Sequence, residues 1–231
     1  MNPSFSDMLH AATLPGQIAI PAGTQLVARL CGLDFEGLFS SEELGFRQPF
    51  DARFAKLLVR TASHLLGGDS GARLAFLERT QFSLALDPAV VAKNWDDALK
   101  LRDYLVGLAS TQLSAQLGAE ALFGCELHAL ADLNQLVSYF AWRQEKAADD
   151  TLDAYCRHAL KGQGVERLLP GMAAEEKREI LGQNEVDWQA LPAWQRVGSV
   201  LVLSEDGKVE IKASLPEGEA FVDAVRGMLG A

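Results

Sequence analysis

Cysteine is scarce in this chain. Among 231 residues there are only Cys31, Cys125 and Cys156, and no two of them have the spacing of a paired motif. An odd count without paired spacing is typical of reduced thiols and does not predict a disulfide framework. We therefore expect a protein of the cytoplasm.

Long apolar runs are also missing. No stretch approaches the roughly 18 apolar residues that a membrane-spanning helix requires. The segment Met1–Gly16 has no basic region ahead of a long apolar core, so the sequence shows no sign of an export signal. These absences predict a protein without a membrane partner.

Basic residues are outnumbered. Lys and Arg total 21 against 31 Asp and Glu, which gives a formal net charge of −10. Proteins that hold a polyanion on their surface normally show the opposite balance. The charge makes tRNA a less favoured partner, and it leaves a nucleotide or a protein partner open.

The composition is that of an ordinary globular protein, with 48% hydrophobic and 23% charged residues. The length fits one large domain with a small appendage. We expect an N-terminal arm over 1–20, a main domain over 21–147, and a helical and hairpin region over 148–231 that packs on the same core.

Hydrophobic periodicity predicts the order of the elements. Alternation over Leu26–Leu30 indicates a strand, whereas apolar residues three and four apart indicate helices. The expected elements are a strand ending at Gly32, a helix capped by Asp51, a β-hairpin over Arg73–Leu86 with its tip at 78–81, a helix from Asn94 to Leu117, a strand over Cys125–Leu130 and a helix capped by Asp132. This β-α-β-β-α-β order predicts the α+β class and a ferredoxin-like sheet.

The remainder of the chain is predicted to form helices, then a hairpin and a final helix. Asp206-Gly207 separates two apolar runs and is a favourable tight turn, because both residues tolerate a positive φ. The expected elements are weakly amphipathic helices over Asp150–Ala159, Gly164–Leu169 and Ala173–Gly182, strands over Ser199–Leu203 and Lys208–Ala213, and a helix over Glu217–Leu229.

A series of short motifs resembles the tRNA(His) guanylyltransferase family, the polymerases that add nucleotides in the 3′-to-5′ direction. No motif is specific alone, but the motifs occur in the family's order over roughly 18–203. They are Arg29-Leu30-Cys31-Gly32 with Phe35, Pro49-Phe50-Asp51-Ala52-Arg53-Phe54, Leu108-Ala109-Ser110, Tyr139-Phe140 with Trp142-Arg143-Gln144, Glu176–Leu181, and Leu191–Arg196 followed by Gly198.

The resemblance implies a palm-like domain, oligomeric assembly, and chemistry that uses two magnesium ions, a nucleoside triphosphate and the 5′ end of a tRNA. It also implies which positions lie near the nucleotide. These are Arg29, Gly32, Phe35, Ser83 and Ser110.

The family's metal-binding carboxylates are absent from the matching positions. Cys31 stands where the family has an aspartate at its first strand end, and Arg79, Thr80 and Gln81 stand in place of its Ser-Asp-Glu hairpin tip. Magnesium prefers hard anionic oxygens, so a thiol and an amide are poor substitutes. We expect no catalytic residues and no cofactor, with Mg²⁺ only if the ligands have been rebuilt.

Nearby residues offer two replacement sites. Asp34, Glu36 and Glu78 are candidates for a rebuilt magnesium site, against the simpler interpretation that they are solvated loop acids. Cys31, Cys125 and His128 are candidates for a soft-metal cluster, against the simpler interpretation that they are core residues. Acidic residues also stand where the family has basic ones, at Asp103, Glu126 and Asp149-Asp150.

Three functions remain open at this stage. The first is a catalytically degenerate relative that binds a nucleotide, an RNA end or a protein partner. The second is an active nucleotidyltransferase with rewired metal ligands. The third is a structural module that forms a stable hetero- or homo-oligomer. A homo-oligomer is the assembly that we expect.

Overall fold

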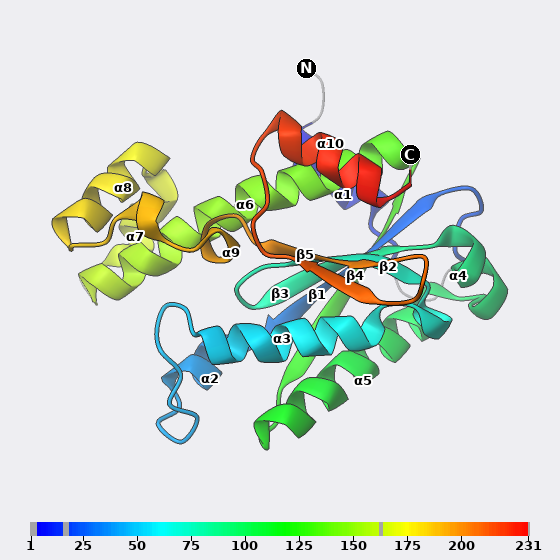
Figure 1. Ribbon diagram of the computed structural model, residues 1–231, viewed down its shortest axis with the longest axis horizontal. Coiled ribbons are helices and arrows are strands. Elements are labelled where there is room, and N and C mark those ends of the chain that lie inside the picture. Colours follow the sequence, from blue (N-terminus) through cyan, green and yellow to red (C-terminus); the bar gives the residue numbers. More distant parts are fainter. Residues whose placement is uncertain (1–3, 16–18, 162–163, 231) are drawn as a thin grey trace.

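The computed structural model describes residues 4–15, 19–161 and 164–230, and its centre is an antiparallel sheet (Figure 1). Within that part of the chain the sheet has six strands in the order β4-β1-β3-β2-β5-β6. The strands are β1 (Gln25–Leu33), β2 (Ala72–Leu77), β3 (Gln81–Leu86), β4 (Leu122–Leu130), β5 (Ser199–Leu203) and β6 (Val209–Lys212).

The sheet order confirms the predicted fold class. The first four strands lie in the order β4-β1-β3-β2, with two α-helices between β1 and β2 and two more between β3 and β4. This is the split βαβ, ferredoxin-like arrangement of the polymerase palm. The C-terminal hairpin extends the same sheet, because β5 pairs with β2 and β6 pairs with β5.

Helices cover both faces of the sheet (Figure 1). Because side chains alternate along β1, Leu26, Ala28 and Leu30 face one core and Val27 faces the other. The first core is closed by α2 (Phe35–Ser40), α3 (Ala52–Leu65), α4 (Pro88–Asn94) and α5 (Ala98–Leu117), and the second by α1 (Phe5–Ala12), α6 (Leu133–Leu160) and α10 (Glu219–Met228).

The longest helix, α6, is one helix where the sequence predicts two. It runs for 28 residues from its cap at Asp132, whose side chain accepts from the backbone N–H of Gln135 at 2.9 Å. No glycine or proline interrupts it, and Ala147, Leu152 and Cys156 continue its buried stripe. Its second half packs against α7 (Val165–Leu168), α8 (Ala174–Gln183) and α9 (Ala193–Arg196) in a smaller core.

Of the predicted caps of α3 and α5, the first is confirmed and the second is wrong. Asp51 caps α3 as expected, because its carboxylate accepts from the backbone N–H of Arg53 and of Phe54. Asn94 does not cap α5. It is the last residue of α4, and Asp97 caps α5 instead.

The first strand also ends later than expected. It continues through Gly32 to Leu33, and the chain turns at Asp34, which has a φ of 54°. The arm expected over 1–20 contains α1, while 1–3 and 16–18 lie outside the described residues. In the described part of the chain no helix is both long and apolar enough to span a membrane.

Candidate functional site

The end of β1 and the tip of the β2–β3 hairpin lie side by side. Cys31 is paired with Gln81 in the register of the two strands, and the Gly32 N–H donates to the Thr80 carbonyl oxygen at 3.0 Å. The structure therefore brings together the three positions where the family resemblance places metal-binding carboxylates.

Gln81 is the centre of a hydrogen-bond network at this position. Its Oε1 accepts from Arg29 Nη2 at 2.8 Å, from Arg29 Nε at 3.2 Å and from Cys31 Sγ at 3.3 Å. Its Nε2 donates to Glu78 Oε2 at 2.9 Å. Burial raises the pKa of Cys31, which keeps the thiol protonated and able to donate.

The carboxylate of Glu78 is held by Arg143 of α6. Arg143 Nε donates to Glu78 Oε1 at 2.9 Å and Nη2 donates to Oε2, so the contact is bidentate. Both side chains are only 3% exposed. Burial raises the pKa of Glu78, and the positive charge of Arg143 opposes that shift.

A second arginine holds Glu36. Arg79 Nη2 donates to Glu36 Oε2 at 3.0 Å, Nη1 contacts Oε1, and Nε donates to the Pro49 carbonyl oxygen at 2.6 Å. The hydrogen bonds from Arg79 lower the pKa of Glu36. The guanidinium also lies over the ring of Phe39, with its carbon 4.8 Å from the ring centroid. The Arg79 side chain is therefore held at the hairpin tip by a carboxylate, a backbone carbonyl and an aromatic ring.

These residues do not fit a pair of magnesium ions. Cys31 presents a protonated thiol and Gln81 an amide. In both Glu36 and Glu78, the two carboxylate oxygens already accept hydrogen bonds from an arginine. Asp34 is exposed beside the start of α2 and lies next to Gly37. Among the described residues, no group of three His, Cys, Asp or Glu side chains is arranged to hold a metal ion.

The soft-metal cluster is not formed. Cys125 is paired with Leu30 and packs against the core under α5, whereas Cys31 and His128 lie on the opposite face, toward α6. His128 instead has its Nδ1 3.0 Å from Thr13 Oγ1. Burial raises the pKa of Cys125 to about 12 and lowers the pKa of His128 to about 4.

The candidate nucleotide-binding residues have internal partners. Ser83 Oγ lies 2.8 Å from the Tyr139 hydroxyl in the core on the α6 side, and Ser110 Oγ accepts from the Phe123 N–H at 3.0 Å on the α5 side. The ring of Phe35 packs so close to Gly32 that any Cβ there would overlap it. Arg29 Nη1 also reaches Glu126 Oε2 at 3.4 Å. The sheet separates Ser110 from Ser83 and Arg29.

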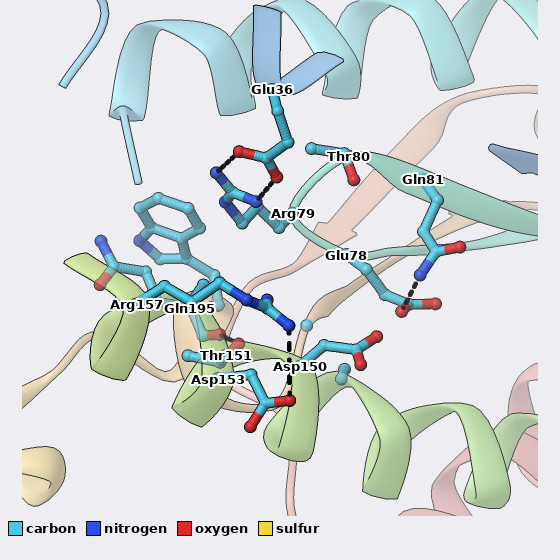
Figure 2. A pocket seen from close by; sticks show the side chains of 14 residues that line it. Glu36, Glu78, Arg79, Thr80, Gln81, Asp150, Thr151, Asp153, Arg157 and Gln195 are labelled. Carbon is cyan, nitrogen blue, oxygen red and sulfur yellow. Dashed lines mark hydrogen bonds and ion pairs between the residues drawn. The ribbon is translucent and has the colours of Figure 1, made fainter. Parts of the chain in front are cut away.

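A cavity of about 200 Å³ lies between the hairpin tip and α6 (Figure 2). Figure 2 shows Asp150 and Asp153 extending from α6 on the side opposite Glu36 and Arg79. Burial raises the pKa of Asp150. The lining residues are Glu36, Glu78, Arg79, Thr80, Gln81, Ala147, Asp150, Thr151, Asp153, Ala154, Arg157, Trp194, Gln195 and Gly198.

The partner of Arg143 was not evident from sequence. The Trp142-Arg143-Gln144 motif marked the residue without indicating which side chain it contacts. Glu78 and Arg143 are far apart in the chain, and only the packing of α6 on the sheet places them together. An acidic residue directly after β2, on the face of the sheet that a helix covers, is the sequence signal that predicts a basic partner on that helix.

Comparisons with known proteins establish the fold. No family model and no curated protein matches the chain. A bacterial tRNA(His) guanylyltransferase (Thg1)-like protein in complex with ATP aligns over 93% of this chain and 94% of its own, with a TM-score of 0.76 and 16% identity. A structure of a bacterial tRNA(His) guanylyltransferase (Thg1)-like protein in complex with GTP aligns with a TM-score of 0.68 and 17% identity, over 93% of each chain.

The tRNA(His) guanylyltransferase of Saccharomyces cerevisiae aligns with a TM-score of 0.70 and 20% identity, over 87% of this chain and 94% of its own. This chain therefore has the palm-type fold of the tRNA(His) guanylyltransferases along nearly all its length, as the motif resemblance predicts.

Proposed function

We propose that this protein is a catalytically degenerate relative of the tRNA(His) guanylyltransferases. It keeps the palm-type frame and acts by binding a nucleotide, an RNA end or a protein partner. The observation that carries the proposal is the double arginine pairing, in which Arg143 holds Glu78 and Arg79 holds Glu36.

The charge balance at the hairpin tip supports this proposal. Two-metal phosphoryl transfer needs several anionic oxygens, because four positive charges must be neutralised within a few ångströms. Here Arg29, Arg79 and Arg143 already neutralise the carboxylates that surround the position. Divalent ions would have to displace Arg143 from the buried carboxylate of Glu78, at a cost of several kcal/mol, and Arg79 from the exposed carboxylate of Glu36.

Calorimetry with ATP and GTP, with and without magnesium, tests the proposal. We expect any affinity to be the same in Mg²⁺ and in EDTA, because the chain supplies cations of its own. A nucleotide affinity that rises tenfold or more with Mg²⁺ would contradict the proposal. Protein denatured by heat provides the baseline for each titration.

An active nucleotidyltransferase with rewired ligands is a second candidate. In its favour, Glu36, Glu78, Asp150 and Asp153 all line the cavity of about 200 Å³. It predicts transfer of labelled nucleotide to a tRNA or small acceptor, with loss of transfer in Glu78→Ala or Asp34→Ala. Absence of transfer across a panel of acceptors argues for the degenerate reading.

A structural module for oligomerisation is the third candidate. Leu33 and Leu122 are paired at the ends of β1 and β4 and are 54% and 46% exposed. The C-terminal helix offers less support, because Phe221 and Val225 are buried in the core under α10. Light scattering tests this candidate, which requires a stable oligomer and no response to nucleotides.

A further inference from the structure

The strand β6 forms an open edge of the sheet. In the described part of the chain it pairs with β5 on one side and is the last strand in the sheet order. Figure 1 shows it at the front of the molecule, between α3 and α10. At the other edge, part of β4 is already paired, since the Leu14 N–H donates to the Leu127 carbonyl oxygen at 2.8 Å. The outer side of β6 therefore offers backbone groups for a further strand.

The outward backbone groups at the middle of β6 belong to Ile211. At the hairpin turn, the Ser204 N–H donates to the Lys208 carbonyl oxygen at 2.8 Å, so Lys208 directs its backbone groups toward β5. Hydrogen-bonded and non-hydrogen-bonded pairs alternate along antiparallel strands, so Glu210 and Lys212 also bond to β5. Ile211 then directs its N–H and its carbonyl oxygen away from β5, to the open side.

The side chain of Ile211 is an exposed apolar group on this edge. It is 56% exposed and lies opposite Leu201, which is buried in the core under α3. Val209, two residues earlier on the same face, packs against that core. Ile211 therefore continues the apolar face of the sheet beyond the last buried position. A further strand would cover this surface with its own side chain at the opposite position.

Opposite charges flank Ile211 along the strand. Glu210 Oε2 accepts from Lys212 Nζ at 2.7 Å, and both side chains are about half exposed on the other face of the sheet. This order of charges is self-complementary. In an antiparallel pair of two such strands centred on Ile211, Glu210 of each strand lies opposite Lys212 of the other, so unlike charges meet at both positions.

We propose that β6 is a docking edge for a second copy of this chain, paired antiparallel about a two-fold axis at Ile211. The Ile211 N–H of each copy donates to the Ile211 carbonyl oxygen of the other, and the two side chains pack together. Glu210 and Lys212 of the two copies form a group of four alternating charges. The two sheets join into one, and the contact is the same from both sides, as a two-fold interface requires.

The interface is small, and its strength follows from its size. A contact of about four residues a side buries less than the roughly 1,000 Å² in total that a stable dimer needs, so the association is weak and reversible. None of the described residues that line the cavity of about 200 Å³ belongs to β6. The dimer therefore leaves that cavity open. The inference goes beyond the proposed function, which holds or fails without it.

Sedimentation equilibrium over roughly 1–500 µM protein tests the docking edge. We expect the mean mass to rise with concentration from the monomer value of 25.0 kDa toward twice that value. Ile211→Ser weakens the dimer by roughly tenfold, because the central apolar contact is lost. Leu168→Ser is the matched control, since Leu168 lies on α7 and is also 56% exposed. Circular dichroism verifies that each variant is folded.

Two charge variants give a result that only this register predicts. Glu210→Lys places lysines opposite lysines, and Lys212→Glu places glutamates opposite glutamates, so each variant alone dimerises roughly tenfold more weakly than the wild type. In an equal mixture of the two variants every opposed pair is Lys with Glu. We expect the mixture to form a heterodimer at least as tight as the wild-type dimer.

Three results would overturn the docking edge. They are a wild-type protein that stays monomeric throughout the range, an oligomer that Ile211→Ser leaves unchanged, and a mixture of the charge variants that associates no better than either variant alone. The proposed function is tested by nucleotide titrations of the same protein. Magnesium-dependent nucleotide binding would contradict that function and would leave the masses of the charge variants as they are.

Discussion

Arg143 of α6 and Glu78, the residue after β2, form a bidentate ion pair in which both side chains are 3% exposed. The pair joins the covering helix α6 to the end of the sheet, beside the position where the family resemblance places metal-binding carboxylates. Its burial means that neither charge has water as an alternative partner.

Loss of the Arg143 side chain is expected to be severely destabilising. Arg143→Met leaves Glu78 buried without its cation and costs about 3–5 kcal/mol of unfolding free energy. Urea unfolding followed by circular dichroism measures this loss. The double variant Arg143→Met/Glu78→Gln recovers a large part of it, because no charge is then left unpaired. A loss below about 1 kcal/mol in the single variant would contradict the buried pair.

His128 is expected to make stability depend on pH. Burial lowers its pKa to about 4, whereas an unfolded histidine has a pKa of about 6.5. The unfolded state then binds more protons between these values, so stability is complete above pH 6.5 and falls as the pH drops toward 4. The shift corresponds to about 3 kcal/mol.

Unfolding free energies of His128→Gln between pH 4 and pH 7 check this dependence. The variant loses most of the slope across that range, whereas His64→Gln, at an exposed position, keeps it. Equal slopes in wild type and His128→Gln would show that other groups cause the dependence.

Asp97 caps the N-terminus of α5, whereas the nearby Asn94 does not. Asp97 Oδ1 accepts from the backbone N–H of Leu99 at 2.7 Å and of Lys100 at 3.2 Å, so Asp97→Ala costs about 1 kcal/mol. Asn94→Ala, at the end of α4, costs less than about half of that. Thermal unfolding of both variants measures the difference, and the reverse order would place the helix start at Asn94 after all.

The two strand cysteines are expected to react slowly with alkylating reagents. Burial raises the pKa of both Cys31 and Cys125, to about 12 for Cys125. At pH 8 the thiolate is then about one part in ten thousand for Cys125, and the thiolate is the nucleophile. Mass spectrometry after iodoacetamide treatment of the native protein measures the rates. A rate at either site equal to that in the unfolded protein would be contrary to this expectation.

Local patterns in the sequence were sufficient to predict the first four strands and the position of the hairpin tip. Alternation along β1 and the polar tip at 78–81 fix two strands whose ends must meet in a ferredoxin-like order. The continuous α6 was missed because the charged segment Glu145–Asp150 resembles a break between helices. The helix persists there because all of those residues tolerate helical backbone and Ala147 keeps a contact with the core.

The partners of the site residues were not predictable in the same way. The pairs Arg143–Glu78 and Arg79–Glu36 depend on how α6 and α2 pack against the sheet, and no local pattern sets that register. Two adjoining hollows beside the end of α6 likewise combine Arg47 with Arg157 and Lys161, which belong to separate segments of the chain.

Because α6 is one continuous helix, the segment around Arg143 and the segment around Arg157 move together. Arg143 and Arg157 are separated by 14 residues of one helix, which is about 21 Å at 1.5 Å per residue. A helix of this length turns about its anchor as a rigid rod. A tilt of about 5° about the Glu78 contact therefore moves the backbone at Arg157 by about 2 Å.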